Sequence, residues 1–141
     1  MKLFNIKIAV LIITILFGAI SSSASTYVSC THRSIYESYT KEDGKTGFTF
    51  MEKFSENSVF IISETEEMFV HKNDDMVSSY YVGPNPEYND STKVWTITVT
   101  SDVGNEYLYM FDFKNKIVKA LIARKDKSIL VMFHIKAVFS K

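Results

Sequence analysis

The chain has 141 residues, 46% of them hydrophobic and 14% aromatic, and its 16 basic residues balance its 16 acidic ones. Because the two signs are interspersed along the sequence, the charge pattern argues against nucleic acid or anionic lipid as a partner. The single cysteine, Cys30, cannot form an internal disulfide, so stability has to come from the packed core.

The first 25 residues have the features of a secretory signal peptide. Lys2 and Lys7 give a positive start, an apolar run extends from Ile8 to Ile20, and small residues follow at 21–25. This run is shorter than the roughly 20 residues that a membrane-spanning helix needs. We therefore expect a cleaved leader at 1–25, a secreted or periplasmic location, and a single mature domain at 26–141. The mature chain then keeps 14 basic and 16 acidic residues, a net charge of −2.

Cys30 stands at the start of the mature chain. The preceding residues, from Tyr27 to Ser29, resemble a degenerate lipobox, but the usual leucine position holds Tyr27 and the apolar run ends ten residues earlier. A free thiol is the favoured interpretation, and we expect contact with a membrane only if Cys30 is lipidated. Cys30 and His32 would share one face of an extended segment, a superficial likeness to a thiol–histidine pair.

The mature chain alternates apolar and polar residues with a period of two, which is the pattern of half-buried strands. Short polar turns separate these runs, and residues 55–57 are interpreted as one such turn. The expected strands lie within 27–40 and at 47–54, 58–63, 67–71, 76–82, 93–101, 106–113, 117–124 and 128–139. Because connections of three or four residues cannot hold a crossover helix, the strands should form an antiparallel meander.

Eight or nine antiparallel strands must close into a small barrel or fold into a β-sandwich, because open edges invite aggregation. The sequence leaves this choice open, with short connections favouring the barrel. The expected shape resembles calycin-like barrels. The Gly-x-Trp motif of the lipocalins is absent, since Trp95 follows Lys93 and Val94.

The connection at 83–92 is longer than the others and holds both prolines of the chain. Proline cannot donate a ladder hydrogen bond, which predicts an exposed loop. A plain crossover between two parts of the sheet is one interpretation. A binding loop is the other, and its side chains Asn85 and Tyr88 are the candidate contacts with a partner protein.

Two strands are apolar on both faces, whereas a strand with one wet face should alternate. Tyr107 and Tyr109 share one side of residues 106–113, with Leu108 and Met110 on the other, and residues 129–138 show the same pattern. Three covers could explain this pattern: another segment of the chain, a small apolar ligand in a lined cavity, or a protein partner.

The sequence carries no nucleophile motif and no Gly-rich phosphate loop, and His32, His71 and His134 have no metal-ligand spacing. We therefore expect no catalytic residue, no metal and no cofactor. The leading hypothesis is an exported binding protein that holds a small apolar or aromatic ligand in a barrel or cleft, with Trp95, Tyr107 and Tyr109 as wall residues. The alternative is a protein-binding module, such as an enzyme inhibitor or immunity protein.

Overall fold

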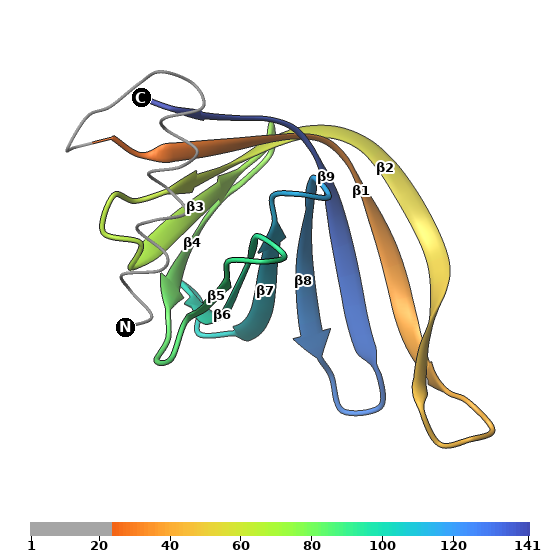
Figure 1. Cartoon of the computed structure of the whole chain (residues 1–141). Coiled ribbons are helices and arrows are strands. Elements are labelled where there is room, and N and C mark those ends of the chain that lie inside the picture. The colour runs from red at the N-terminus through yellow and green to blue at the C-terminus, as the bar shows by residue number, and fades with distance from the viewer. Residues whose placement is uncertain (1–23) are drawn as a thin grey trace.

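A computed structural model describes residues 24–141, and every regular element in this part of the chain is a β-strand (Figure 1). This confirms the all-β class. The predicted leader lies at 1–25, so all but its last two residues fall outside the described residues. The strands are β1 (Thr26–Thr40), β2 (Thr46–Ile62), β3 (Met68–Lys72), β4 (Val77–Val82), β5 (Glu87–Asn89), β6 (Val94–Ser101), β7 (Glu106–Asp112), β8 (Ile117–Ala123) and β9 (Ser128–Ser140).

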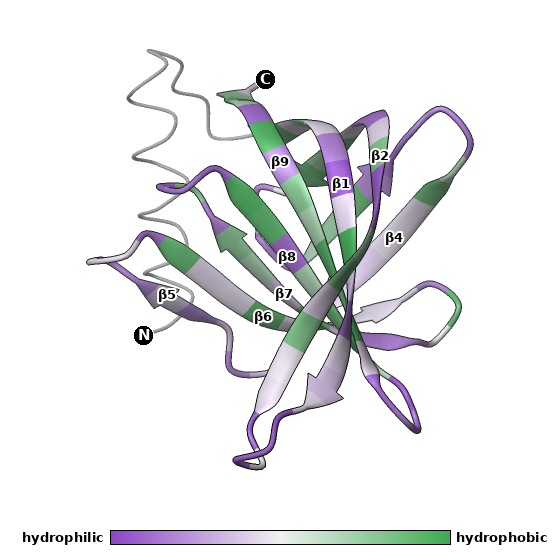
Figure 2. Ribbon diagram, turned by 90° about the vertical axis from the view of Figure 1, so that its right-hand side faces the viewer, coloured by the Kyte–Doolittle hydropathy of each residue, from purple (hydrophilic) through white to green (hydrophobic). Residues whose placement is uncertain are grey.

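The strands form one antiparallel sheet in the order β4-β3-β2-β1-β9-β8-β7-β6-β5. A further pairing closes this sheet, because Tyr80–Val82 of β4 bonds to Val99–Ser101 of β6. Eight strands therefore form a closed barrel, visible in side view in Figure 2. The short β5 is a ninth strand, paired with Val94–Thr96 on the same edge of β6. The barrel alternative was correct, and the general shape is that of a small calycin-like barrel.

One predicted turn is absent. Residues 55–57 do not reverse the chain; they lie inside β2, which runs unbroken for 17 residues. Next to them, Cys30 of β1 pairs with Ser58 and His32 pairs with Ser55, so two residues of β2 face only one of β1. This is a β-bulge, which absorbs the polar residues that the sequence presented as a turn.

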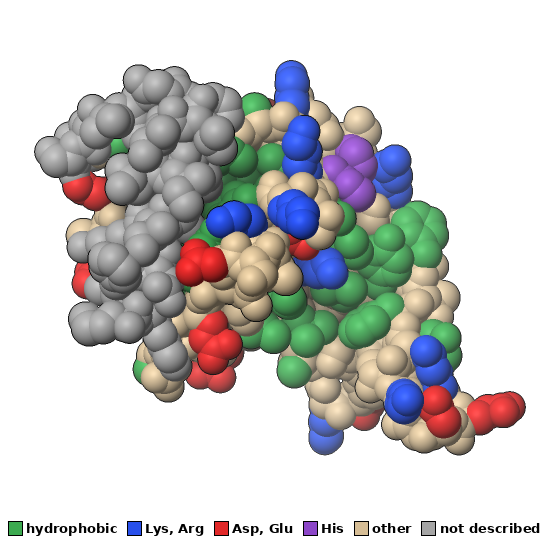
Figure 3. Space-filling model, viewed as in Figure 1, with side chains coloured by type: hydrophobic (Ala, Val, Ile, Leu, Met, Phe, Trp, Pro, Cys, Tyr) green, Lys and Arg blue, Asp and Glu red, His purple; other side chains and the backbone are tan. Residues whose placement is uncertain are grey.

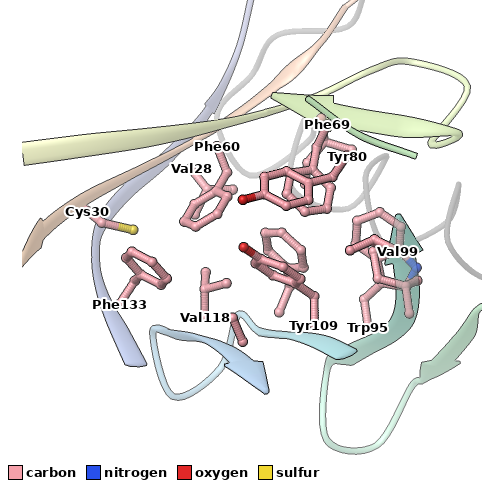
Figure 4. Packing of buried hydrophobic residues seen from close by; sticks show 14 of the residues in the cluster. Val28, Cys30, Phe60, Phe69, Tyr80, Trp95, Val99, Tyr109, Val118 and Phe133 are labelled. Atoms are coloured by element: carbon pink, nitrogen blue, oxygen red, sulfur yellow. The ribbon is translucent and has the colours of Figure 1, made fainter. Parts of the chain in front are cut away.

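The inward-facing side chains fill the barrel. Alternate residues of each strand point inside, and most of these are apolar and almost fully buried. Their rings meet near the middle, where Phe60 of β2 lies 5.5 Å from Phe111 of β7 and 5.1 Å from Phe133 of β9 between centroids (Figure 4). An eight-stranded barrel has an interior just wide enough for such side chains to occupy it.

The hairpin between β1 and β2 extends beyond the barrel (Figure 1). β3 pairs with β2 only from Val59 to Ile62, so within residues 24–141 the edge of β2 at 46–58 has no partner strand. Phe50 and Met51, in this stretch, are about half exposed. A cross-strand aromatic ring covers Gly47, since a Cβ there would lie 2.6 Å from the Tyr39 ring.

Candidate functional site

Two of the three predicted wall residues lie in the packed interior. Trp95 is 2% exposed, and its ring centroid is 5.3 Å from that of Phe111. Tyr109 is 3% exposed and contacts Phe69 at 5.0 Å and Tyr80 at 5.4 Å between ring centroids (Figure 4). These rings therefore contact other side chains of the barrel on several sides.

The interior also contains polar groups. The hydroxyls of Tyr80 and Tyr109 share a hydrogen bond, and burial raises the pKa of Tyr109 well above its usual value. His71 stacks on Phe60 with ring centroids 4.2 Å apart and meets Phe133 edge-on at 5.0 Å. Burial, with a smaller contribution from the charge of Arg33, lowers the pKa of His71 to about 4. His71 is therefore neutral at physiological pH, which suits a ring enclosed by aromatic side chains.

The third predicted wall residue, Tyr107, is half buried near one end of the barrel. Its ring lies 5.7 Å from that of Tyr80, and it borders an open hollow on the outer surface. The three residues thus share the inner side of β6 and β7, as the alternation predicted. Only Tyr107 of the three lines a described hollow.

The predicted binding loop at 83–92 is less simple than expected, because it contains the strand β5. Asn85 is exposed with a φ of 61°, a left-handed conformation that asparagine tolerates. Tyr88 pairs with Trp95 across the two strands and is half buried against the core. The structure therefore places Asn85 in solvent, whereas Tyr88 borders an open groove of about 610 Å³ together with Thr96, Met110 and Asn115.

The possible thiol–histidine pair does not form. Cys30 faces the interior opposite Ile135, whereas His32 faces outward opposite His134, because the bulge between them reverses the alternation. Burial raises the pKa of Cys30 to about 12, which keeps the thiol protonated. In residues 24–141 no three side chains of histidine, cysteine, aspartate or glutamate come together as a metal site.

The outer face carries the feature that strand alternation alone could not locate. Leu108 pairs with Leu121, Leu121 with Leu130, Leu130 with Tyr36, and Tyr36 with Phe50. These five side chains form an apolar row across β7, β8, β9, β1 and β2, about 19 Å long at the usual strand spacing. Figure 3 shows hydrophobic side chains gathered on this side of the molecule. We call these five residues the apolar row.

One end of the apolar row lies in a hollow. Leu108 and Leu121 line an open depression of about 450 Å³ together with Pro84 and Thr98. The backbone packs tightly here, because Gly83 donates its N–H to the Thr98 carbonyl at 2.7 Å, and a Cβ at Gly83 would lie 2.8 Å from the Thr98 hydroxyl. The loop at 83–92 thus forms one wall of a hollow that a partner's side chain could enter.

The apolar row also explains why two strands are apolar on both faces. Their inner sides fill the barrel, and their outer sides form the row together with neighbouring strands. In residues 24–141 the extensive contacts between elements are all contacts between sheet neighbours, so no described element covers the outer face. Of the three covers considered for the outer face, a described segment of the same chain is therefore excluded.

Comparison with protein-family models, curated proteins and solved structures gives no match for this chain. In the described part of the chain, no helix has the length and apolar character needed to span a bilayer. The class that the fold supports is a small antiparallel β-barrel, an architecture consistent with a binding protein.

Proposed function

We propose that this chain is an exported, non-catalytic binding module that engages a partner protein through the outer face of its barrel. The observation that carries the proposal is the apolar row, five side chains in register on five adjacent strands. Contiguous apolar surface on a soluble protein marks interaction sites, and tyrosine and phenylalanine are enriched in such interfaces.

The filled interior favours the outer face over the lumen. Phe60, Phe69 and Tyr109 contact one another with ring centroids between 5.0 and 6.1 Å apart. A ligand at this level would have to displace rings that are at most 3% exposed. Opening a packed aromatic core costs several kcal/mol, and this cost would be subtracted from the affinity of any ligand bound there.

The free edge of β2 adds a second element to the proposed contact. The apolar row ends at Phe50, which lies on the stretch of β2 that has no neighbouring strand. Unpaired N–H and C=O groups on a sheet edge can accept an extended segment of another protein by strand addition. A partner strand at 46–57 would gain main-chain hydrogen bonds and apolar contacts with the row at the same time.

A second candidate follows from the groove beside β5. Its lining combines the Tyr88 ring and the Met110 side chain with polar groups of Asp112 and Asn115, and its volume of about 610 Å³ suits a small molecule. In this second candidate a small aromatic ligand is held in an outer cleft, and the candidate predicts a co-purifying molecule in native mass spectrometry.

The primary proposal is tested by affinity capture from the periplasm and secretions of the host. We expect the wild-type protein to retain one stoichiometric partner, and Phe50→Ser or Leu130→Ser to lose it. Val77→Ser is the matched control, because Val77 is 61% exposed on β4, outside the apolar row. Capture that survives both row substitutions, or that the control abolishes equally, would contradict the proposal.

A further inference from the structure

We propose that a second part of the outer face, distinct from the apolar row, docks on membranes rich in anionic phospholipid. This basic zone comprises Lys53, Lys119 and Lys141, the histidine pair His32 and His134, and the stacked rings of Tyr27 and Phe139. It shares no residue with the apolar row, so the inference goes beyond the proposed function and can fail independently of it.

The interspersed charges of the sequence argued against anionic lipid as a partner, but the strand register brings together lysines that are far apart in the sequence. Lys119 of β8 pairs with Met132 of β9, Met132 pairs with Ser34 of β1, and Ser34 pairs with Lys53 of β2. The two lysines therefore project outward from the same row, three strands apart. Figure 3 shows Lys and Arg side chains grouped beside histidine on this face.

Carboxylates are absent from the outer sides of three strands of the zone, whereas Asp112 of β7 lies at its border, opposite Ile117. β8 and β9 contain no aspartate or glutamate, and the only one in β1 is Glu37. Glu37 pairs with Ile129, which packs against the core, and its carboxylate accepts a hydrogen bond from Lys127. The outer sides of β1, β8 and β9 thus have no negative side chain, although the mature chain as a whole is slightly acidic.

The centre of the basic zone is a pair of histidines. His32 and His134 face each other across β1 and β9, with ring centroids 4.0 Å apart and nearly parallel planes. Burial lowers the pKa of His134, and the positive charges of His32 and Lys53 lower it further. His134 is therefore largely uncharged at neutral pH, and the lysines supply positive charge on either side of it.

Aromatic rings and a lysine lie at the end of the zone where β1 begins and β9 ends. Tyr27 stacks on Phe139 at 5.3 Å, and the Lys141 ammonium lies 5.5 and 6.0 Å from the two ring centroids. Aromatic rings beside lysine are typical of surfaces that reach the interface between water and lipid.

The composition favours lipid over an acidic protein as the occupant. The cations of the zone are lysines, which are depleted in protein interfaces, and the two described arginines lie elsewhere: Arg33 pairs with Glu56, and Arg124 follows β8. An anionic membrane needs no bidentate geometry, and each lysine near its surface raises the binding constant about fivefold.

Sedimentation with lipid vesicles tests the inference on the exported protein. We expect binding to vesicles of equal parts phosphatidylglycerol and phosphatidylcholine and no binding to pure phosphatidylcholine, with binding lost as salt rises from about 0.1 M to about 1 M. The double variant Lys53→Glu, Lys119→Glu should bind at least about 25-fold more weakly. The control Lys45→Glu, Lys125→Glu carries the same net charge but changes the hairpin tip and the β8–β9 turn, and should bind like the wild type.

Three outcomes would overturn the inference. They are absence of binding to the anionic vesicles, equal binding to both vesicle types, and an equal loss of binding in the control variant. The salt dependence of the wild type keeps the test valid even if the double variant misfolds. Should the zone variant lose a captured protein partner while vesicles never bind, the occupant is an acidic protein instead. Loss of capture in Phe50→Ser bears only on the proposed function.

Discussion

Acid sensitivity at His71 tests whether the barrel interior is filled. The pKa of His71 falls from 6.5 to about 4 because its ring is buried against Phe60 and Phe133. In the unfolded chain the ring would titrate near its ordinary value, so below pH 6.5 protons bind the unfolded state more readily than the native one. Stability should therefore fall from pH 6.5 down to about pH 4 and then lose its dependence on this group.

The magnitude follows from the size of the pKa difference. A difference of roughly 2.5 units corresponds to about 3 kcal/mol of unfolding free energy. Urea denaturation of the wild type and of His71→Leu, at a pH above 7 and again near pH 4, measures this term. The variant should lose about 3 kcal/mol less on acidification than the wild type, because other titrating groups are common to both proteins.

Titration of the histidine ring resonances by NMR gives the same information at a single site. We expect the His71 resonances to stay those of a neutral ring until the pH approaches 4. A His71 pKa near 6.5, together with equal acid sensitivity of wild type and variant, would mean that water reaches the interior. The lumen would then have room for a ligand, and the case for the outer face would be lost.

Three further predictions concern the core, the apolar row and the thiol. Tyr109→Ala should cost about 3–5 kcal/mol in urea denaturation, as expected for a large core side chain, and a change below 1 kcal/mol would show an open wall instead. Phe50→Ser should change the unfolding free energy by no more than about 0.5 kcal/mol, since its side chain is half exposed, so a large loss of stability would assign it to the core. Cys30 should react with Ellman's reagent only after denaturation, because it is buried and its pKa is raised to about 12, and rapid reaction of the native protein would contradict the packing.

Much of the fold could be predicted from the sequence. Period-two alternation located most of the strands, and it assigned Trp95, Ile97 and Val99 to one face, which is the inner face. Short turns predicted an antiparallel order. The polar residues 55–57 misled, because a bulge in a long strand and a tight turn favour the same residue types.

The functional surface could not be predicted in the same way. The apolar row depends on which residues of five strands lie opposite one another, and register is set by bulges and turns that the sequence pattern does not fix. The excess of apolar residues on the strand at 106–112 was the available signal, and it indicated a second covered face without showing its neighbours. The sequence signal for the basic zone was weaker, because Lys53 and Lys119 are 66 positions apart in the sequence.

Amide hydrogen exchange of the protein alone and with its captured partner tests the central claim most directly. In the free protein, the amides on the open edge of β2 at 46–57 should exchange fast, because no strand of the described chain pairs with that edge. In the complex, the account predicts new protection of the amides at 46–57 and of those in β8 and β9, whose outer sides carry part of the apolar row. Protection confined to the groove beside β5, with residues 46–57 unchanged, would contradict it.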